Sequence, residues 1–208
     1  MANIYSITIS IFQKEKREKL EYLWQKRQRK FKHLLFEGIR MKGMLNDYYS
    51  IIELLRIAGE IEGRKKMQKI VYILKSLGVN FIEDFYFHYY GPYSDTLTVK
   101  LEELKSMNII EEIKDESGAF PKYTYRLKIE DNDIKNGLEK YRSLIDILNG
   151  QNARFLELVA TVIYFNREGY SREEICEKVK IVKSDKNYTD DEMDSAFDFL
   201  KEIYDGKI

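Results

Sequence analysis

Residues 85–94 read FYFHYYGPYS and decide much of the fold, because they place a tight turn between an extended segment and a helix. Six of these residues are aromatic, and the stretch holds one of the two histidines of the 208-residue chain. Gly91 and Pro92 predict the turn, and Ser94 can cap the helix that follows it. Such a dense aromatic stretch belongs to a chemical site, a binding surface or a packed core.

The residues around this stretch alternate between helical and strand-like patterns. Two helices with apolar stripes precede it, a helix and a hairpin follow it, and the second strand of the hairpin alternates strictly. This order of helix, helix, strand, helix and hairpin is expected of a winged helix-turn-helix. The predicted elements are helices at 46–58 and 64–78, an extended segment at 81–90, a helix containing Leu97, Leu101 and Leu104, and strands at 109–114 and 123–129.

Three further helices are predicted in the C-terminal part of the chain. Ser171 with Glu174, and Thr189 with Glu192, have the spacing of two capping boxes, and the last of these helices follows the second box. The sequence therefore predicts an α+β fold that is mostly α. Its winged-helix-like core with a small β-hairpin occupies residues 44–130, and the additional C-terminal helices occupy 131–208.

Residues 1–43 differ from the rest of the chain in charge. They hold eleven Lys and Arg against four Asp and Glu, whereas the remaining residues hold twenty-four against thirty-one. An apolar stripe at helical spacing over 16–36 predicts that this basic N-terminal extension is helical. A solvated helix is the preferred interpretation, and an arm that contacts nucleic acid or docks on a partner is the alternative.

The composition excludes several classes of chemistry. The single cysteine, Cys176, allows no intramolecular disulfide and is typical of a reducing compartment, so we expect a cytoplasmic protein. No segment has the length and apolarity of a membrane span, and no signal peptide is evident. One cysteine and two distant histidines do not form a metal site, and no nucleophile has an adjacent base. The sequence predicts a protein without cofactor, metal or catalytic residues.

Basic residues on the predicted helix at 64–78 form the most prominent charged feature. On a helical wheel they fall on one face, which could contact a phosphate backbone or could simply be solvated. The acidic residues of the predicted hairpin, at Glu111, Glu112 and Glu116, argue against simple DNA binding. The residues of this basic face are Arg64, Lys65, Lys66, Lys69 and Lys75.

Two stretches taken together resemble a known family. GRKKMQKIVY at 63–72, followed by HYYGPYS at 88–94, is similar to the paired motifs of YwgA-like proteins. These are similar in turn to the Panacea domain of SocA-type antitoxins and of phage-associated proteins. The resemblance begins near Met44, and it implies a helical domain with a small hairpin and no catalytic role. It also implies a protein partner, because antitoxins of this type neutralise or deliver a toxin or client by direct contact.

Most of the matched motif is expected to be structural. His88 is predicted to be a packed core residue, and the aromatic residues at 85–90 are predicted to pack under the helix at 64–77. The motif residues in this structural role are Gly63, Gln68, His88, Gly91, Pro92 and Ser94.

Tyr89, Tyr90 and Tyr93 are predicted to bind the partner wherever they face outward, because tyrosine gives a large contact area with one polar group. The leading functional hypothesis is a protein-binding module that acts as an antitoxin-like regulator. The alternative is a winged-helix DNA-binding regulator that uses the basic face.

Overall fold

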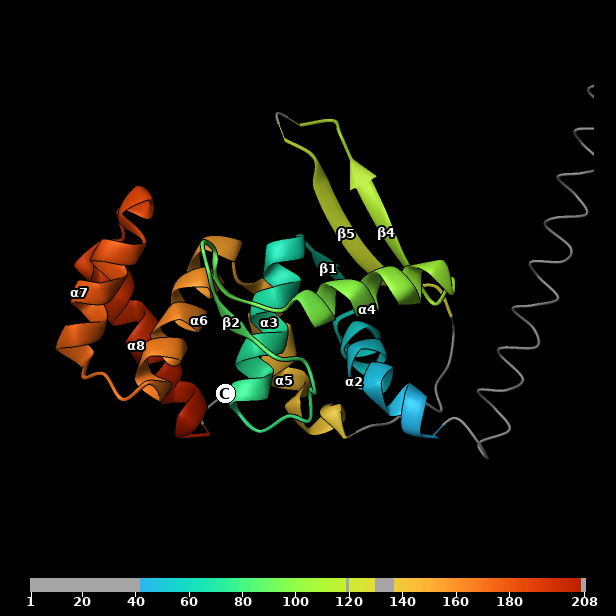
Figure 1. Cartoon of the computed structure of the whole chain (residues 1–208), viewed down its shortest axis with the longest axis horizontal. Helices are drawn as coiled ribbons and strands as arrows, with labels where there is room; N and C mark the ends of the chain where they lie inside the picture. The colour runs from blue at the N-terminus through green and yellow to red at the C-terminus, as the bar shows by residue number, and fades with distance from the viewer. Residues whose placement is uncertain (1–41, 119, 130–136, 207–208) are drawn as a thin grey trace, which may run out of the picture. The chain divides into compact units, whose positions relative to one another are not determined.

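The chain is described here from a computed structural model, which describes residues 42–118, 120–129 and 137–206 (Figure 1). The predicted helical extension at 1–43 lies almost wholly outside these residues. Asn46–Ile208 forms one compact unit. Among the described residues, no helix is both long and apolar enough to cross a bilayer.

The described residues form an α+β fold in which helix predominates, as the sequence predicts. The winged-helix assignment itself stays a prediction. The helices are α2 (Lys42–Ala58), α3 (Arg64–Ser76), α4 (Asp95–Ser106), α5 (Arg142–Gly150), α6 (Ala153–Arg167), α7 (Arg172–Val182) and α8 (Asp190–Tyr204), with the 3-10 turns η1 (Leu138–Tyr141) and η2 (Ser184–Lys186). The strands are β1 (Glu60–Glu62), β2 (Tyr86–His88), β3 (Gly91–Tyr93), β4 (Ile110–Asp115) and β5 (Lys122–Leu127).

A three-stranded antiparallel sheet is built from segments on either side of the aromatic stretch. Its order is β1-β5-β4, and Ile61 of β1 pairs with Tyr125 of β5. The sequence predicted only a helix break at 59–63 and missed β1, which is too short to show a strand pattern. Gly63 follows β1 with φ +108°, and its N–H donates to Tyr123 O at 2.6 Å, so it turns the chain from β1 into α3. The β4–β5 hairpin extends away from the helices (Figure 1).

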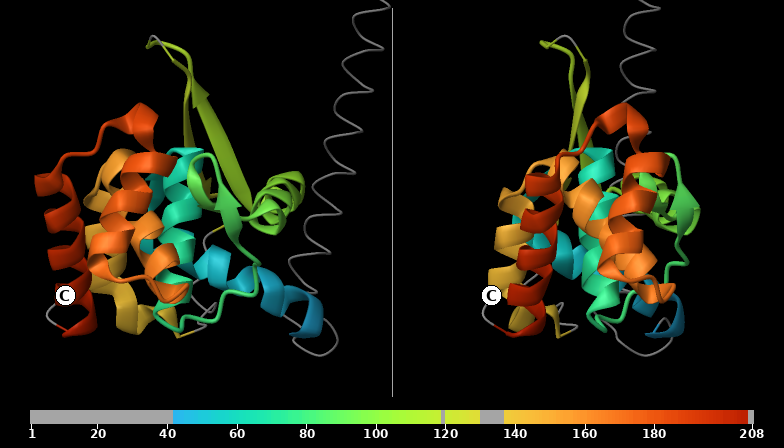
Figure 2. Two further views of the ribbon diagram at one scale, coloured as in Figure 1. Left: turned by 60° about the vertical axis from the view of Figure 1, so that its left-hand side comes forward. Right: turned by 90° about the vertical axis from the view of Figure 1, so that its left-hand side faces the viewer.

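Helix α6 is the centre of the helical part. It contacts α3 on one side and α7 and α8 on the other, and the views in Figure 2 show these helices grouped around it. A helix surrounded in this way needs apolar side chains around most of its circumference, which explains the sequence LVATVI at 158–163. Both predicted capping boxes are present, at Ser171 with Glu174 and at Thr189 with Glu192.

The aromatic stretch forms a second, two-stranded sheet of its own. Strands β2 and β3 pair antiparallel, with Phe87 opposite Pro92 and His88 opposite Gly91. The turn between them is therefore Tyr89-Tyr90, and the prediction that Gly91 and Pro92 form the turn is wrong by two residues. Pro92 is accommodated because a strand in a two-stranded sheet does not need every N–H. Phe87 packs on α6, with its ring centroid 5.0 Å from that of Tyr164 and 5.1 Å from that of Phe165.

Gly91 lies close to α6. Its φ is +77°, and a Cβ placed on it would lie only 2.9 Å from the Oγ1 atom of Thr161. Both the backbone angle and the close approach therefore require glycine at this position.

Replacing Gly91 by alanine is expected to destabilise the fold by about 2–4 kcal/mol, since left-handed strain and overpacking act together. Gly169→Ala is the matched control, because Gly169 has φ +89° and open space around it. It should cost only the backbone strain of about 1–2 kcal/mol. Adding Thr161→Ala to Gly91→Ala should recover part of the loss. Urea unfolding of the three variants measures these differences, and equal losses for the two glycine variants would contradict the packing explanation.

Candidate functional site

Two consecutive residues of α3 bind the backbone of the GPYS segment. The side-chain amide of Gln68 accepts the Ser94 N–H at 2.9 Å and donates to the Ser94 carbonyl, also at 2.9 Å. The Lys69 ammonium donates to the Pro92 carbonyl at 2.5 Å. The two sequence motifs that carry the family resemblance are therefore joined by direct hydrogen bonds.

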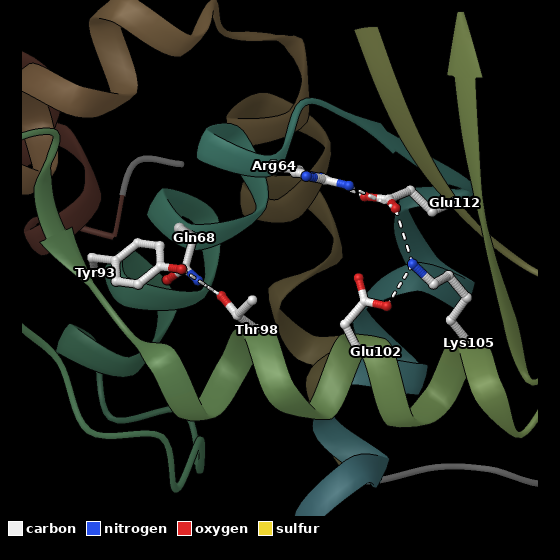
Figure 3. Close-up of polar contacts among 7 residues, drawn as sticks. All are labelled: Arg64, Gln68, Tyr93, Thr98, Glu102, Lys105 and Glu112. Atoms are coloured by element: carbon white, nitrogen blue, oxygen red, sulfur yellow. Dashed lines mark hydrogen bonds and ion pairs between the residues drawn. The ribbon is translucent and has the colours of Figure 1, made fainter. Parts of the chain in front are cut away.

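Gln68 and Tyr93 also contact the first turns of α4. Gln68 Nε2 also donates to Thr98 Oγ1 at 3.0 Å, and the Tyr93 hydroxyl lies 2.8 Å from the same oxygen. Figure 3 shows these side chains meeting between α3 and α4. Ser94 caps α4, as the sequence predicts, by accepting the Leu97 N–H at 3.1 Å. Gln68 thus sets the position of α4 relative to α3 and of the strand that leads into it.

Three charged residues lie buried beneath the β2–β3 hairpin. Lys69 and Lys183 are each 1% exposed, and Glu157 of α6 is 4% exposed. The Lys183 ammonium donates to Glu157 Oε1 at 2.8 Å and to the carbonyl of Tyr89. The ammonium groups of Lys69 and Lys183 are therefore both buried near the Glu157 carboxylate. Each of them also donates a hydrogen bond to a backbone carbonyl of the hairpin.

This arrangement shifts the protonation of Lys69. The pKa of the Lys69 ammonium is lowered to about 7, mainly by burial; Glu157 opposes the shift, and the neighbouring Lys183 and Lys65 add to it. Burial disfavours the charged form of a lysine, and nearby cations act in the same direction.

A second charged network joins the N-terminus of α3 to β4 and α4. Arg64 donates two hydrogen bonds to Glu112, at 2.6 and 2.9 Å, and Lys105 lies 3.2 Å from the same carboxylate. Lys105 also pairs with Glu102 at 2.6 Å, and Figure 3 shows Lys105 between the two acids. The hydrogen bonds from Arg64 lower the pKa of Glu112 to about 2. This carboxylate is therefore fully ionised at neutral pH.

A cavity of about 400 Å³ opens beside these two networks. It lies between the first turns of α3, the β2–β3 hairpin, α4 and β5. Its walls combine cationic and aromatic side chains with few acids, and most of them come from the two motifs. The lining residues are Arg64, Lys65, Gln68, Lys69, His88, Tyr90, Tyr93, Thr98, Leu101, Glu102 and Tyr125.

The predicted basic face of α3 is not a continuous solvent-facing surface, and this prediction is corrected. Lys69 is buried, Lys66 donates to the Asn149 carbonyl, and Lys75 donates to the Glu83 carbonyl at 2.5 Å. Arg64 and Lys65 are exposed, but Arg64 is paired with Glu112. The β2–β3 hairpin covers part of this face, and helical periodicity alone could not place that hairpin.

The prediction that His88 lies in the core is also wrong. His88 is exposed, because β2 alternates and turns Phe87 inward while Tyr86 and His88 point outward. The prediction for the aromatic residues holds in part, since Phe85 packs against Tyr72 of α3 with ring centroids 5.1 Å apart.

The three tyrosines predicted to bind a partner differ in exposure. Tyr89 is 58% exposed and Tyr90 is 36% exposed, while Tyr93 is half-buried and bonded to Thr98. The rings of Tyr89 and Tyr90 meet edge to face, with centroids 4.9 Å apart. The Lys65 ammonium lies 3.4 Å from the Tyr90 ring centroid. Tyr89 and Tyr90 thus form an ordered, solvent-facing pair.

Glu157 and Lys183 complete the buried cluster and were not predicted from the sequence. A signal for Glu157 was present, because it is the only acid within the apolar helix sequence FLELVATVIYF at 155–165. A carboxylate inside such a helix is buried only when it is paired. Lys183 offered no comparable signal, since it follows α7 in a segment rich in lysine.

Comparison with known proteins places the chain in a family. The chain matches no protein-family model. Over 166 residues it is 37% identical to the uncharacterised protein YwgA of Bacillus subtilis (strain 168), covering 77% of this chain and 98% of that protein. The chain belongs to the YwgA family. The YwgA resemblance predicted from the paired motifs is therefore confirmed, and the link to the Panacea domain stays a prediction.

The part of this YwgA-family chain that the structure describes includes the single cysteine, Cys176. Among these residues, no group of three or more His, Cys, Asp or Glu is placed to hold a metal ion. Cys176 is half-buried, and burial raises the pKa of its thiol, which makes it a weak nucleophile at neutral pH.

Replacing Gln68 by leucine is expected to destabilise the protein by about 2–4 kcal/mol. The change keeps the side chain's size but leaves the buried N–H of Ser94 without its partner and removes one of the hydrogen bonds to the Ser94 carbonyl. Gln151→Leu, at a half-buried position after α5, is the control and should change stability by less than about 0.5 kcal/mol. Chemical denaturation measures both, and a loss in Gln68→Leu no larger than in the control would contradict this role.

Lys69 is expected to contribute an unfolding free energy that rises with pH between about 7 and 10. The pKa of Lys69 is about 7 when folded and 10.5 in its ordinary state. In this window the unfolded chain binds a proton that the folded chain does not, so raising the pH favours folding. Wild type should gain up to about 1.4 kcal/mol per pH unit relative to Lys69→Met. Parallel stability curves from pH 6.5 to 9.5 would contradict the lowered pKa.

Proposed function

We propose that this YwgA-family protein is a non-catalytic protein-binding module that uses the tip of the β2–β3 hairpin. The observation that carries the proposal is the exposure of Tyr89 and Tyr90 side by side on a two-residue turn. Exposed tyrosines are frequent hot spots of protein interfaces, because they bury a large area and donate one hydrogen bond.

The hairpin tip is held in place before any partner arrives. Lys183 binds the Tyr89 carbonyl, Lys69 binds the Pro92 carbonyl, and Lys65 covers the ring of Tyr90. An interface whose backbone and rings are already ordered loses less conformational entropy on binding. The buried cations therefore support the proposal by making the tyrosine pair a rigid anchor.

The resemblance to the Panacea domain suggests what kind of partner binds. In that domain the module acts as an antitoxin that contacts a toxin directly or delivers it elsewhere. By analogy, the partner of this protein is a toxin or a client protein.

The alternative, DNA binding through α3, has weaker support. Four of the five predicted basic residues bond to acids or carbonyls of the protein itself: Arg64, Lys66, Lys69 and Lys75. Near the tip of the β4–β5 hairpin, Lys114 is paired with Glu116. Contacts with phosphate would have to replace these interactions, at a cost in affinity.

Affinity capture from the native host with the full-length chain tests the proposal. The double variant Tyr89→Ala with Tyr90→Ala should lose a stoichiometric protein partner, because both anchors are removed. Tyr204→Ala is the control, since Tyr204 lies on α8 and is 56% exposed. Binding of the recovered partner to purified protein should change little between 50 and 500 mM salt.

Two results would overturn the protein-binding proposal. One is retention of the partner by the double tyrosine variant at wild-type levels. The other is recovery of nuclease-sensitive material alone, with binding that falls steeply with salt, which would move the protein to the DNA-binding class.

A further inference from the structure

The cavity beside α3 is built mainly from the two family motifs, yet the protein-binding proposal uses only its rim. Tyr90 belongs both to the exposed tyrosine pair and to the cavity wall. The other motif side chains in the wall face a space of about 400 Å³, which lies within the usual range for small-molecule sites.

The charges around this cavity are unbalanced. Lys69 and Lys183 have one buried carboxylate, Glu157, between them, and Lys183 lies within hydrogen-bonding distance of it. Lys65 lies near the same carboxylate, and its own pKa is lowered, mainly by burial and further by the nearby Lys186, while Glu157 and Asp185 oppose the shift. Asp185 is itself paired with Lys186 at 3.0 Å. Crowded ammonium groups repel one another, so an anion brought among them would be stabilised.

The acids in and near the cavity do not supply that anion. Glu102 is the carboxylate in the wall, and it is paired with Lys105 at 2.6 Å. Glu112, behind Arg64, already accepts from Arg64 and Lys105. Both carboxylates are therefore already engaged by cations of the protein.

The remaining walls are aromatic. Tyr90, Tyr93, His88 and Tyr125 line the cavity together. The ring centroids of His88 and Tyr93 lie 5.5 Å apart at an interplanar angle of 40°, so these two rings contact each other and form a continuous wall. Aromatic walls favour a planar ring as ligand.

We propose that this cavity binds a small anion carrying a planar ring, the chemistry shared by nucleoside monophosphates and aryl phosphates. The anionic group lies against Lys65 at the mouth of the cavity, near Lys69, and the ring lies against the tyrosine and histidine walls. This site shares Lys65 and Tyr90 with the protein-binding proposal, but its ligand lies in the interior of the cavity rather than on the exposed pair.

Calorimetric titration of the full-length protein tests the site with defined probes. These are AMP, GMP, CMP and UMP, phenyl phosphate, inorganic phosphate and uncharged adenosine. At least one ring-bearing phosphate should bind at least about tenfold more tightly than both inorganic phosphate and adenosine, since only it uses both halves of the cavity. Tight binding of phenyl phosphate would identify an aryl phosphate site, and binding of nucleotides alone would identify a nucleotide site.

Variants of Lys65 distinguish a specific binding site from a general attraction of anionic probes to lysines of the protein. Lys65 is exposed, so Lys65→Gln should fold normally and weaken the best probe by about tenfold, the loss of one charge-assisted contact. Lys65→Arg should retain most of the affinity. Lys140→Gln is the matched control, because Lys140 lies 4.9 Å from the ring centroid of Tyr141, outside the cavity.

Three results would overturn the proposal. The first is that no ring-bearing phosphate binds with a Kd below about 1 mM. The second is that inorganic phosphate or adenosine binds as tightly as the best ring-bearing probe. The third is that Lys65→Gln and Lys140→Gln weaken the best probe equally.

Discussion

The rest of the site depends on one side-chain amide that pairs with one peptide unit. Gln68 both accepts from and donates to Ser94, as a neighbouring strand would. Buried backbone groups must find partners, and here a glutamine supplies them where the chain passes from strand to helix. This pair fixes β3 against α3 and starts α4 at a defined place. The cavity walls and the exposed tyrosine turn both follow from that geometry.

The buried charges beneath the hairpin have a different role from the amide pair. Burying Lys69, Lys183 and Glu157 together costs solvation, and apolar side chains of similar size would often be at least as stable. Their arrangement instead selects one position for the hairpin, because each ammonium binds a particular carbonyl, of Pro92 or of Tyr89. Apolar side chains could not distinguish one carbonyl from the next.

The sequence predicts best those features of the structure that depend on residues a few positions apart in the chain. The cap at Ser94 and the two later capping boxes depend on residues three positions apart, and all are found. Strand β1 was missed, since three residues show no period. His88 was assigned to the core because the alternation of the three-residue strand β2 was not recognised. Lys69 was assigned to an open helix face because its partners, Pro92 and Glu157, are distant in sequence. The cavity could not be predicted for the same reason, as its walls come from α3, the hairpin, α4 and β5.

The contact between Lys183 and the Tyr89 carbonyl also has a consequence for biosynthesis. The two residues are separated by 94 positions, so the hairpin leaves the ribosome long before the ammonium that holds its turn. At about 5–20 residues per second, the interval is roughly 5–20 s. When the hairpin leaves the ribosome, Gln68 and Lys69, which precede it, have already been made, whereas Glu157 and Lys183 have not. The nascent chain can therefore join α3 to β3 early, whereas the tyrosine turn reaches its final support only when the C-terminal helices are being completed.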